Sequence, residues 1–112
     1  MAISKQFLSS STNGRPIKIV ATATAGTLLH TAHATDKDEI FLFLCNTSAS
    51  DVLVTVEFGG VTSPDDHIKM TVPANDCVMI IAGVPLSNSL LMRAFAGTAN
   101  VVTAFGYANR IS

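Results

Sequence analysis

Short runs rich in β-branched and aromatic residues, separated by turn residues, extend along most of this chain. No helical repeat of apolar residues persists in any of these runs, and Gly, Pro, Asn or Asp follows nearly every one. These features restrict the chain to short strands joined by turns. The predicted strands are residues 16–24, 27–33, 39–47, 52–58, 67–72, 77–82 (ended by Gly83 and Pro85), 89–96 and 100–108.

This set of about eight strands predicts an all-β fold, an antiparallel β-sandwich of the jelly-roll or immunoglobulin-like kind. The 112 residues of the chain are enough for one domain. Residues 1–15 are rich in Ser and Thr and lack periodicity, so they are predicted to form an extended N-terminal arm. The sandwich domain is predicted to comprise residues 16–112.

Two of the predicted strands do not alternate between apolar and polar residues. Residues 40–45 and 78–81 are apolar at every position. The outer face of an antiparallel sandwich is normally polar, so a strand that is apolar on both faces needs cover on both sides. Because no helix is predicted to provide that cover, we expect the N-terminal arm or another subunit to do so.

The chain also has few charged residues for its size. They make up 13% of the sequence, whereas about 25% is typical, and the hydrophobic fraction of 48% is ordinary. Ser, Thr and Asn can cover part of the surface. The interpretation we favour is that protein partners cover much of it, because large apolar patches usually mark interfaces.

Charge and hydropathy patterning argue against two classes of partner. The formal net charge is -1 and the seven basic residues are scattered, so we expect no nucleic-acid partner. No apolar run approaches the roughly 20 residues that span a bilayer, so we expect no membrane partner. The first residues lack the apolar segment of a signal peptide, which predicts synthesis in the cytoplasm.

No pattern of chemically active side chains points to an enzyme. The chain has no G-x-S-x-G motif and no phosphate-binding loop, so no catalytic and no cofactor-binding residue is predicted. Cys45 and Cys77 lie in apolar runs and are predicted to be reduced, buried thiols; a disulfide would require their strands to be neighbours.

Metal binding and sugar binding are also weakly supported. His30, His33 and His67 are expected to be surface or interface residues, since His30 and His33 fall on opposite faces of a regular strand and cannot share a metal. The acidic segments 36–39 and 65–66 lack the spacing of a calcium loop. With no Trp, one Tyr (Tyr107) and six Phe that are predicted to fill the core, an aromatic platform for sugars is not expected.

The residue patterns of several segments resemble those of small virion structural proteins of tailed bacteriophages. The resemblance implies a capsid decoration, or cement, protein, which is a β-sandwich that forms a homotrimer on the capsid surface and binds the major capsid protein. It also leaves open other virion proteins of the neck, tail or fibre base, and a receptor- or carbohydrate-binding module is a further alternative. The segments that carry it are residues 13–19, 38–42, 45–48, 54–60, 71–74 and 105–111.

This resemblance and the apolar strands together suggest where partners bind. The arm contributes Phe7, Leu8 and Arg15 as candidate interface residues, and the strand that is apolar on both faces contributes Phe41 and Phe43. Removal of residues 1–12 is expected to weaken association with the particle and to leave the sandwich folded. The protein is expected in the virion, after synthesis in the host cytoplasm.

Overall fold

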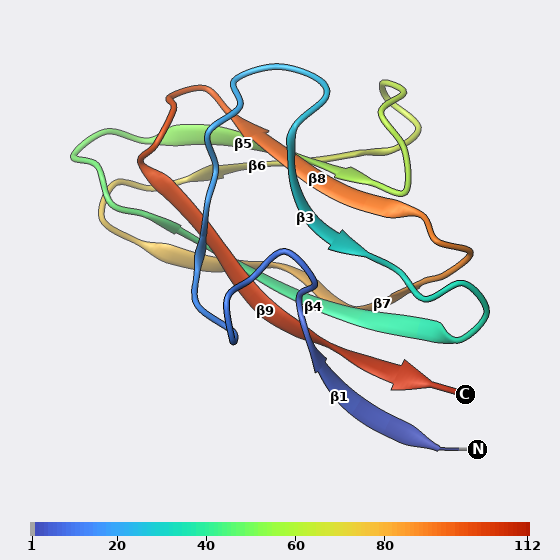
Figure 1. The fold of residues 1–112 in the computed structure, drawn as a ribbon. Coiled ribbons are helices and arrows are strands. Elements are labelled where there is room, and N and C mark those ends of the chain that lie inside the picture. The colour runs from blue at the N-terminus through green and yellow to red at the C-terminus, as the bar shows by residue number, and fades with distance from the viewer. Residues whose placement is uncertain (1) are drawn as a thin grey trace.

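The computed structural model describes residues 2–112, which form two antiparallel sheets packed face to face (Figure 1). None of these residues is helical, so the predicted all-β fold class is confirmed. The strands are β1 (Ile3–Phe7), β2 (Ile17–Lys18), β3 (Thr27–Thr31), β4 (Lys37–Asn46), β5 (Val52–Phe58), β6 (His67–Val72), β7 (Cys77–Leu86), β8 (Leu91–Ala96) and β9 (Val102–Ile111).

The order of the strands shows how the chain is wound. One sheet has the order β1-β9-β4-β7, with β2 also paired to β9, and the other has the order β3-β8-β5-β6. Strands β2 and β9, β3 and β8, β4 and β7, and β5 and β6 are therefore nested antiparallel pairs. A long hairpin rolled up in this way gives the order of a jelly roll, one of the two sandwich types that the sequence predicts.

The core between the sheets is aliphatic. Alternate residues of β4 point inward, and Ile40, Leu42 and Leu44 are fully buried there against residues such as Val54 and Val56 of β5. The prediction that the phenylalanines fill the core is wrong for five of the six, because only Phe58 packs against the core, and it is partly buried. The alternation of strand residues places most of them on the outer faces instead.

The N-terminal segment is built into the sandwich more closely than a free arm would be. Strand β1, which the sequence did not predict, pairs along its whole length with residues 107–111 of β9. The next residue, Leu8, is 1% exposed and lies in the core. Residues 2–8 are therefore part of the fold. Met1, the first residue of the predicted arm, lies outside the described residues.

Strands β2 and β7 differ most from their predicted ranges. Strand β2 has two residues, because the chain crosses to the other sheet, where the Ala96 amide donates to the Ala21 carbonyl. Strand β7 runs through Gly83 and Pro85, which were predicted to end it. Gly83, with a φ of 79°, takes up an extra residue in a β-bulge, and Pro85 is tolerated because β7 is an edge strand.

Strands β4 and β7 are also joined covalently. Cys45 and Cys77 are directly opposite each other in the ladder and form a disulfide with an S–S distance of 2.02 Å. The prediction of two reduced, buried thiols is therefore wrong. The alternation of β4 turns Cys45 away from the core, and Cys77 is exposed at the edge of the sheet.

Candidate interaction surface

The outer face of the sheet β1-β9-β4-β7 carries five aromatic side chains, which we call the aromatic face: Phe7, Phe41, Phe43, Phe105 and Tyr107. The register brings them together, because Phe41 and Phe7 both lie opposite Tyr107, and Phe43 lies opposite Phe105. Side chains directly opposite each other in an antiparallel ladder share a face of the sheet. The aromatic face is therefore a direct result of the register between β1, β9 and β4.

The rings of the aromatic face are stacked in pairs across β4 and β9. The ring centroids of Phe41 and Tyr107 are 4.8 Å apart, and those of Phe43 and Phe105 are 5.4 Å apart. Gly106 lies between the two aromatic residues of β9, and its missing side chain lets β9 approach the Phe41 carbonyl closely. Stacked aromatic pairs of this kind fix the side chains in place, so the face is a preformed surface.

The apolar surface continues onto the edge strand β7. Met79 lies opposite Phe43 and is 50% exposed, and the Cys45–Cys77 disulfide occupies the next row of the sheet. At the other edge, Phe7 is 61% exposed. A patch of this kind, which spans four strands, is larger than the scattered apolar residues of an ordinary surface.

The N-terminal segment does not cover this surface. Strand β1 lies beside β9 in the plane of the sheet (Figure 1). It adds Phe7 to the aromatic face. The strand apolar on both faces thus has its inner side in the core and its outer side on the aromatic face. The sequence predicted that either the arm or another subunit covers this strand. The described part of the arm does not lie over the aromatic face.

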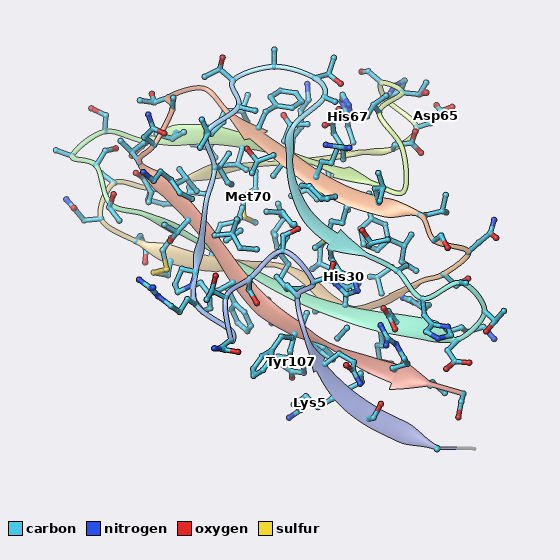
Figure 2. The ribbon with its side chains drawn as sticks, viewed as in Figure 1. Lys5, His30, Asp65, His67, Met70 and Tyr107 are labelled. Carbon is cyan, nitrogen blue, oxygen red and sulfur yellow. A yellow bond between two sulfur atoms is a disulfide. The ribbon has the colours of Figure 1, made fainter. Side chains whose placement is uncertain are left out.

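The outer face of the other sheet is different in character. It carries Glu57, His67, Lys69 and Arg93, which are neighbours in the ladders of β5 with β6 and β8. Figure 2 shows His67 on the opposite side of the molecule from Lys5 and Tyr107. This face also carries Leu53, which is 48% exposed, and Phe95, and Glu57 is fully buried beneath the loop before β3. The clustering of stacked aromatic rings therefore distinguishes the aromatic face from this one.

Two opposite charges border the aromatic face in a single row of the sheet. Lys5 of β1 and Glu39 of β4 lie on either side of Asn109 of β9, each directly opposite it. The Lys5 Nζ atom is 4.8 Å from the centroid of the Tyr107 ring. Neither Lys5 nor Glu39 forms an ion pair with another of residues 2–112.

A cleft of about 370 Å³ lies at the β1 end of the aromatic face. It is lined by Lys5, Gln6, Phe7, Gly14, Gly106 and Tyr107. A second cleft of about 260 Å³ lies beside Arg93, between the loop after β5 and the start of β8. Only the first joins aromatic side chains to polar ones that can donate hydrogen bonds.

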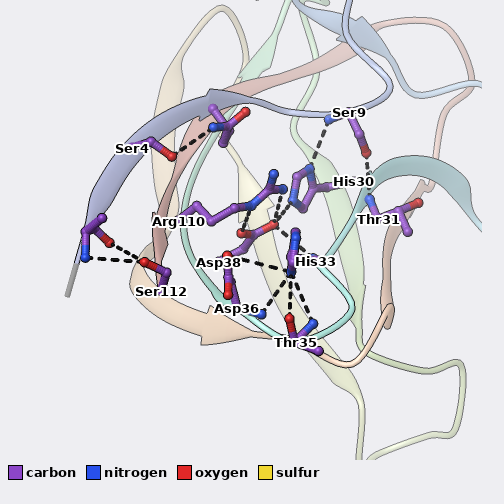
Figure 3. Close-up of polar contacts among 12 residues, drawn as sticks. Ser4, Ser9, His30, Thr31, His33, Thr35, Asp36, Asp38, Arg110 and Ser112 are labelled. Carbon is purple, nitrogen blue, oxygen red and sulfur yellow. Dashed lines mark hydrogen bonds and ion pairs between the residues drawn. The ribbon is translucent and has the colours of Figure 1, made fainter.

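A buried polar cluster joins β3, β4 and β9 (Figure 3). His30, which was expected at the surface or an interface, is 1% exposed. Its Nδ1 atom accepts a hydrogen bond from the Ser9 amide at 2.9 Å, and its Nε2 atom lies 2.8 Å from Asp38 Oδ2. Both ring nitrogens are therefore occupied, so the imidazole has no free nitrogen that could act as a base on a substrate.

The charge of Asp38 is stabilised within this cluster. Burial raises the pKa of Asp38, but hydrogen bonds from Arg110 and His30 outweigh that effect and lower the pKa to about 2. The hydrogen bond to Asp38 in turn raises the pKa of Arg110. The cluster is thus a fully paired structural unit.

A second buried pair lies under the loop before β3. The fully buried Glu57 accepts hydrogen bonds from the Thr24 hydroxyl and from the Gly26 amide, the latter at 2.6 Å. His67 Nε2 is 3.6 Å from Glu57 Oε2, and both ring nitrogens of His67 are buried without a hydrogen-bond partner. No group of three or more His, Cys, Asp or Glu side chains within residues 2–112 is arranged to hold a metal ion.

The candidate interface residues divide into three groups. Phe7, Phe41 and Phe43 come together on the aromatic face, Leu8 lies in the core, and Arg15 is exposed in the loop before β2. Sequence reasoning missed Phe105 and Tyr107 as members of this surface. Their spacing of two in a strand, beside a glycine, is the signal that could have placed them on one face.

Fold and surface together define a jelly-roll sandwich with one open aromatic face. Comparison of the chain with protein-family models, with curated proteins and with solved structures gives no match. Across the described chain, no helix is long and apolar enough to cross a membrane.

Proposed function

We propose that this chain is a non-enzymatic virion structural protein that acts through protein–protein contacts, most specifically a capsid decoration protein of a tailed bacteriophage. The observation that carries the proposal is the aromatic face, a preformed surface of stacked rings on one side of a sandwich whose other side carries Lys69 and Arg93. The segments that resemble virion proteins support it. So does the jelly-roll order, which viral capsid domains share, although a fold alone assigns no function.

In this proposal the chain forms homo-oligomers and binds the major capsid protein at the capsid surface, after synthesis in the host cytoplasm. The resemblance favours a trimer. Each contact is modest, but copies repeated over a shell give a large combined affinity. Because aromatic residues and Met are enriched at the centres of protein interfaces, the aromatic face and Met79 fit this role.

The first test asks where the protein resides. Particles are purified from cells that produce the protein and are imaged after labelling with an antibody against it. Label distributed over the head supports a decoration protein. Label at the neck, tail or fibre base alone would favour the other virion roles, and particles without the protein would contradict the proposal.

The second test uses two exposed apolar residues as a matched pair. Met79 is 50% exposed beside the aromatic face, and Leu53 is 48% exposed on the outer face of the other sheet. Met79→Lys should reduce co-sedimentation of the protein with undecorated shells, whereas Leu53→Lys should not. Equal binding by both variants would contradict a role for this face.

A second candidate function is supported by the cleft at the β1 end of the aromatic face. Its lining combines Tyr107 and Phe7 with the amine of Lys5 and the amide of Gln6. Rings that stack on sugars and polar groups that bind hydroxyls are the usual components of a carbohydrate site. Binding to a glycan array that is lost in Tyr107→Ala and kept in Leu53→Ala would favour a carbohydrate- or receptor-binding module.

A further inference from the structure

The row of residues that crosses Asn109 has a symmetry that suits a second copy of the same face. Lys5 and Glu39 lie one strand to either side of β9, opposite in charge and without ion-pair partners among the described residues. In the next row, Phe7 and Phe41 lie one strand to either side of Tyr107. Each of these two rows thus has complementary groups on either side of β9, whereas the row of Ile111 has Lys37 and Ile3 there.

We infer that the aromatic face binds the aromatic face of a second copy of this chain, about a two-fold axis that runs along β9. Turning one sheet over about this axis exchanges the positions of β1 and β4. Lys5 of each copy then faces Glu39 of the other, and Phe7 of each copy faces Phe41 of the other. A two-fold interface uses the same patch on both subunits, so the ion pair forms twice.

This inference rests on the proposed assembly role, identifies the partner of the aromatic face, and replaces the trimer that the resemblance implies with a pair of chains. Charge complementarity is its main support, because a face with a single sign of charge would repel its own copy. Two sheets stacked in this way also have the usual geometry of aligned sheets, with strand directions within about 30°.

The extent of the face sets the strength of the pairing. Strands β1, β9 and β4 overlap at a spacing of about 4.8 Å over three rows about 7 Å apart, which gives a flat area of roughly 300 Å². A standard interface buries about 800 Å² on each partner. We therefore expect weak, reversible pairing. Strand β7 lies outside the overlap, so Met79 stays free to contact a shell.

Pairing through the edge strand β7 is less favourable than pairing through the face. The ladder of β7 with β4 shifts register twice, between Ile40 and Phe41 and between Leu42 and Phe43. Pro85 also lies on this edge. Bulges and proline are the features that keep an edge strand from pairing with another chain.

The test is a charge exchange in the intact protein. Wild type should have the mass of two chains by light scattering at high concentration and low salt. Lys5→Glu and Glu39→Lys should each raise the dissociation constant about tenfold, since each places two like charges in contact. The double variant K5E/E39K should restore pairing. The matched control Lys69→Glu, on the outer face of the other sheet, should leave it unchanged.

A second measurement keeps the inference falsifiable if a variant folds poorly. Asn109 would lie on the axis and face its own copy, so oxidised Asn109→Cys should give covalent dimers on a non-reducing gel. Thr71→Cys, on the other outer face, should not. A monomer at all concentrations, a mass of three chains, or a double variant as weak as the single ones would overturn the two-fold pairing. The proposed function is judged separately, by labelling of particles and by the Met79→Lys variant.

Discussion

Arg110 and Asp38 face each other across the ladder between β4 and β9 and are joined by two hydrogen bonds. The Nε–Oδ1 distance is 2.8 Å and the Nη2–Oδ2 distance is 3.0 Å. The Asp38 side chain is fully buried, and it also contacts His30, which binds the amide of Ser9. This one carboxylate therefore connects both sheets and the N-terminal segment.

Replacement of Arg110 should destabilise the fold strongly. Arg110→Met keeps most of the side-chain packing but leaves the buried Asp38 carboxylate without its main partner. Breaking a buried ion pair in this way costs about 3 kcal/mol or more. Urea unfolding should show this loss. The matched variant Arg15→Met, at an exposed loop residue, should change the unfolding free energy by less than about 0.5 kcal/mol. Equal losses of unfolding free energy in the two variants would contradict the structural role of the cluster.

The same cluster predicts how the unfolding free energy depends on pH in acidic solution. The pKa of Asp38 is lowered from 3.8 to about 2 in the folded state. Its contribution to stability is therefore complete above pH 4 and is lost as the pH falls through about 2, with a size of about 2 kcal/mol. The difference in unfolding free energy between wild type and Arg110→Met should shrink over this range. A constant difference between pH 5 and pH 2 would refute the assignment.

Two adjacent residues of the N-terminal segment should respond in opposite ways. Leu8 lies in the core, so Leu8→Ala should lower the unfolding free energy by about 2 to 4 kcal/mol. Phe7 is exposed on the aromatic face, so Phe7→Ala should change stability little and weaken self-association. Thermal unfolding and light scattering of both variants measure the two effects. Removal of residues 1–12 is accordingly expected to destabilise the sandwich, which replaces the expectation from the sequence.

Reduction of the disulfide should destabilise the protein without changing its fold. Cys45 and Cys77 are 32 residues apart, and closing a loop of this length in the unfolded chain is worth about 3 to 4 kcal/mol. Guanidinium unfolding with and without a reducing agent should reveal this difference. The double variant C45S/C77S is the control, and its stability should not respond to the reducing agent.

Two glycines provide a matched test of the close approach between β9 and β4. A Cβ atom on Gly106 would collide with the Phe41 carbonyl oxygen, and its φ of 154° is unfavourable for other residues. A Cβ atom on Gly97 would meet only the Leu53 carbonyl oxygen, at an ordinary 3.8 Å. Gly106→Ala should therefore lower the melting temperature and the near-ultraviolet signal of Tyr107, and Gly97→Ala should do neither.

Local patterns in the sequence predicted some elements well. The alternation of residues 52–58 and the turn residues around them predicted β5, and the lack of alternation in residues 40–45 predicted that β4 is apolar on both faces. Strand β1 was missed because Ile-Ser-Lys-Gln-Phe has little apolar character of its own. It forms a strand because it pairs with β9, and a pairing partner so far away in the chain cannot be recognised from the local sequence.

The candidate site depended on the same kind of non-local information. Phe41 and Phe43 were predicted as interface residues from one strand alone. Their stacking on Tyr107 and Phe105 follows from the register between β4 and β9, which are more than 50 residues apart in the chain. The pairing of Cys45 with Cys77, and the choice of a jelly roll over an immunoglobulin-like order, required the strand order as well.

The first and last described residues meet at one edge of the molecule. The Ser112 amide donates to the Ala2 carbonyl at 3.0 Å, and Figure 1 shows the two ends side by side. A short peptide could join them, and new ends could then be opened in an exposed loop such as residues 61–65, giving a circular permutant with the same core. A protein fused at residue 2 or at residue 112 would lie beside Ile3 and Ile111. A protein fused to the new ends of the permutant would lie next to the other sheet.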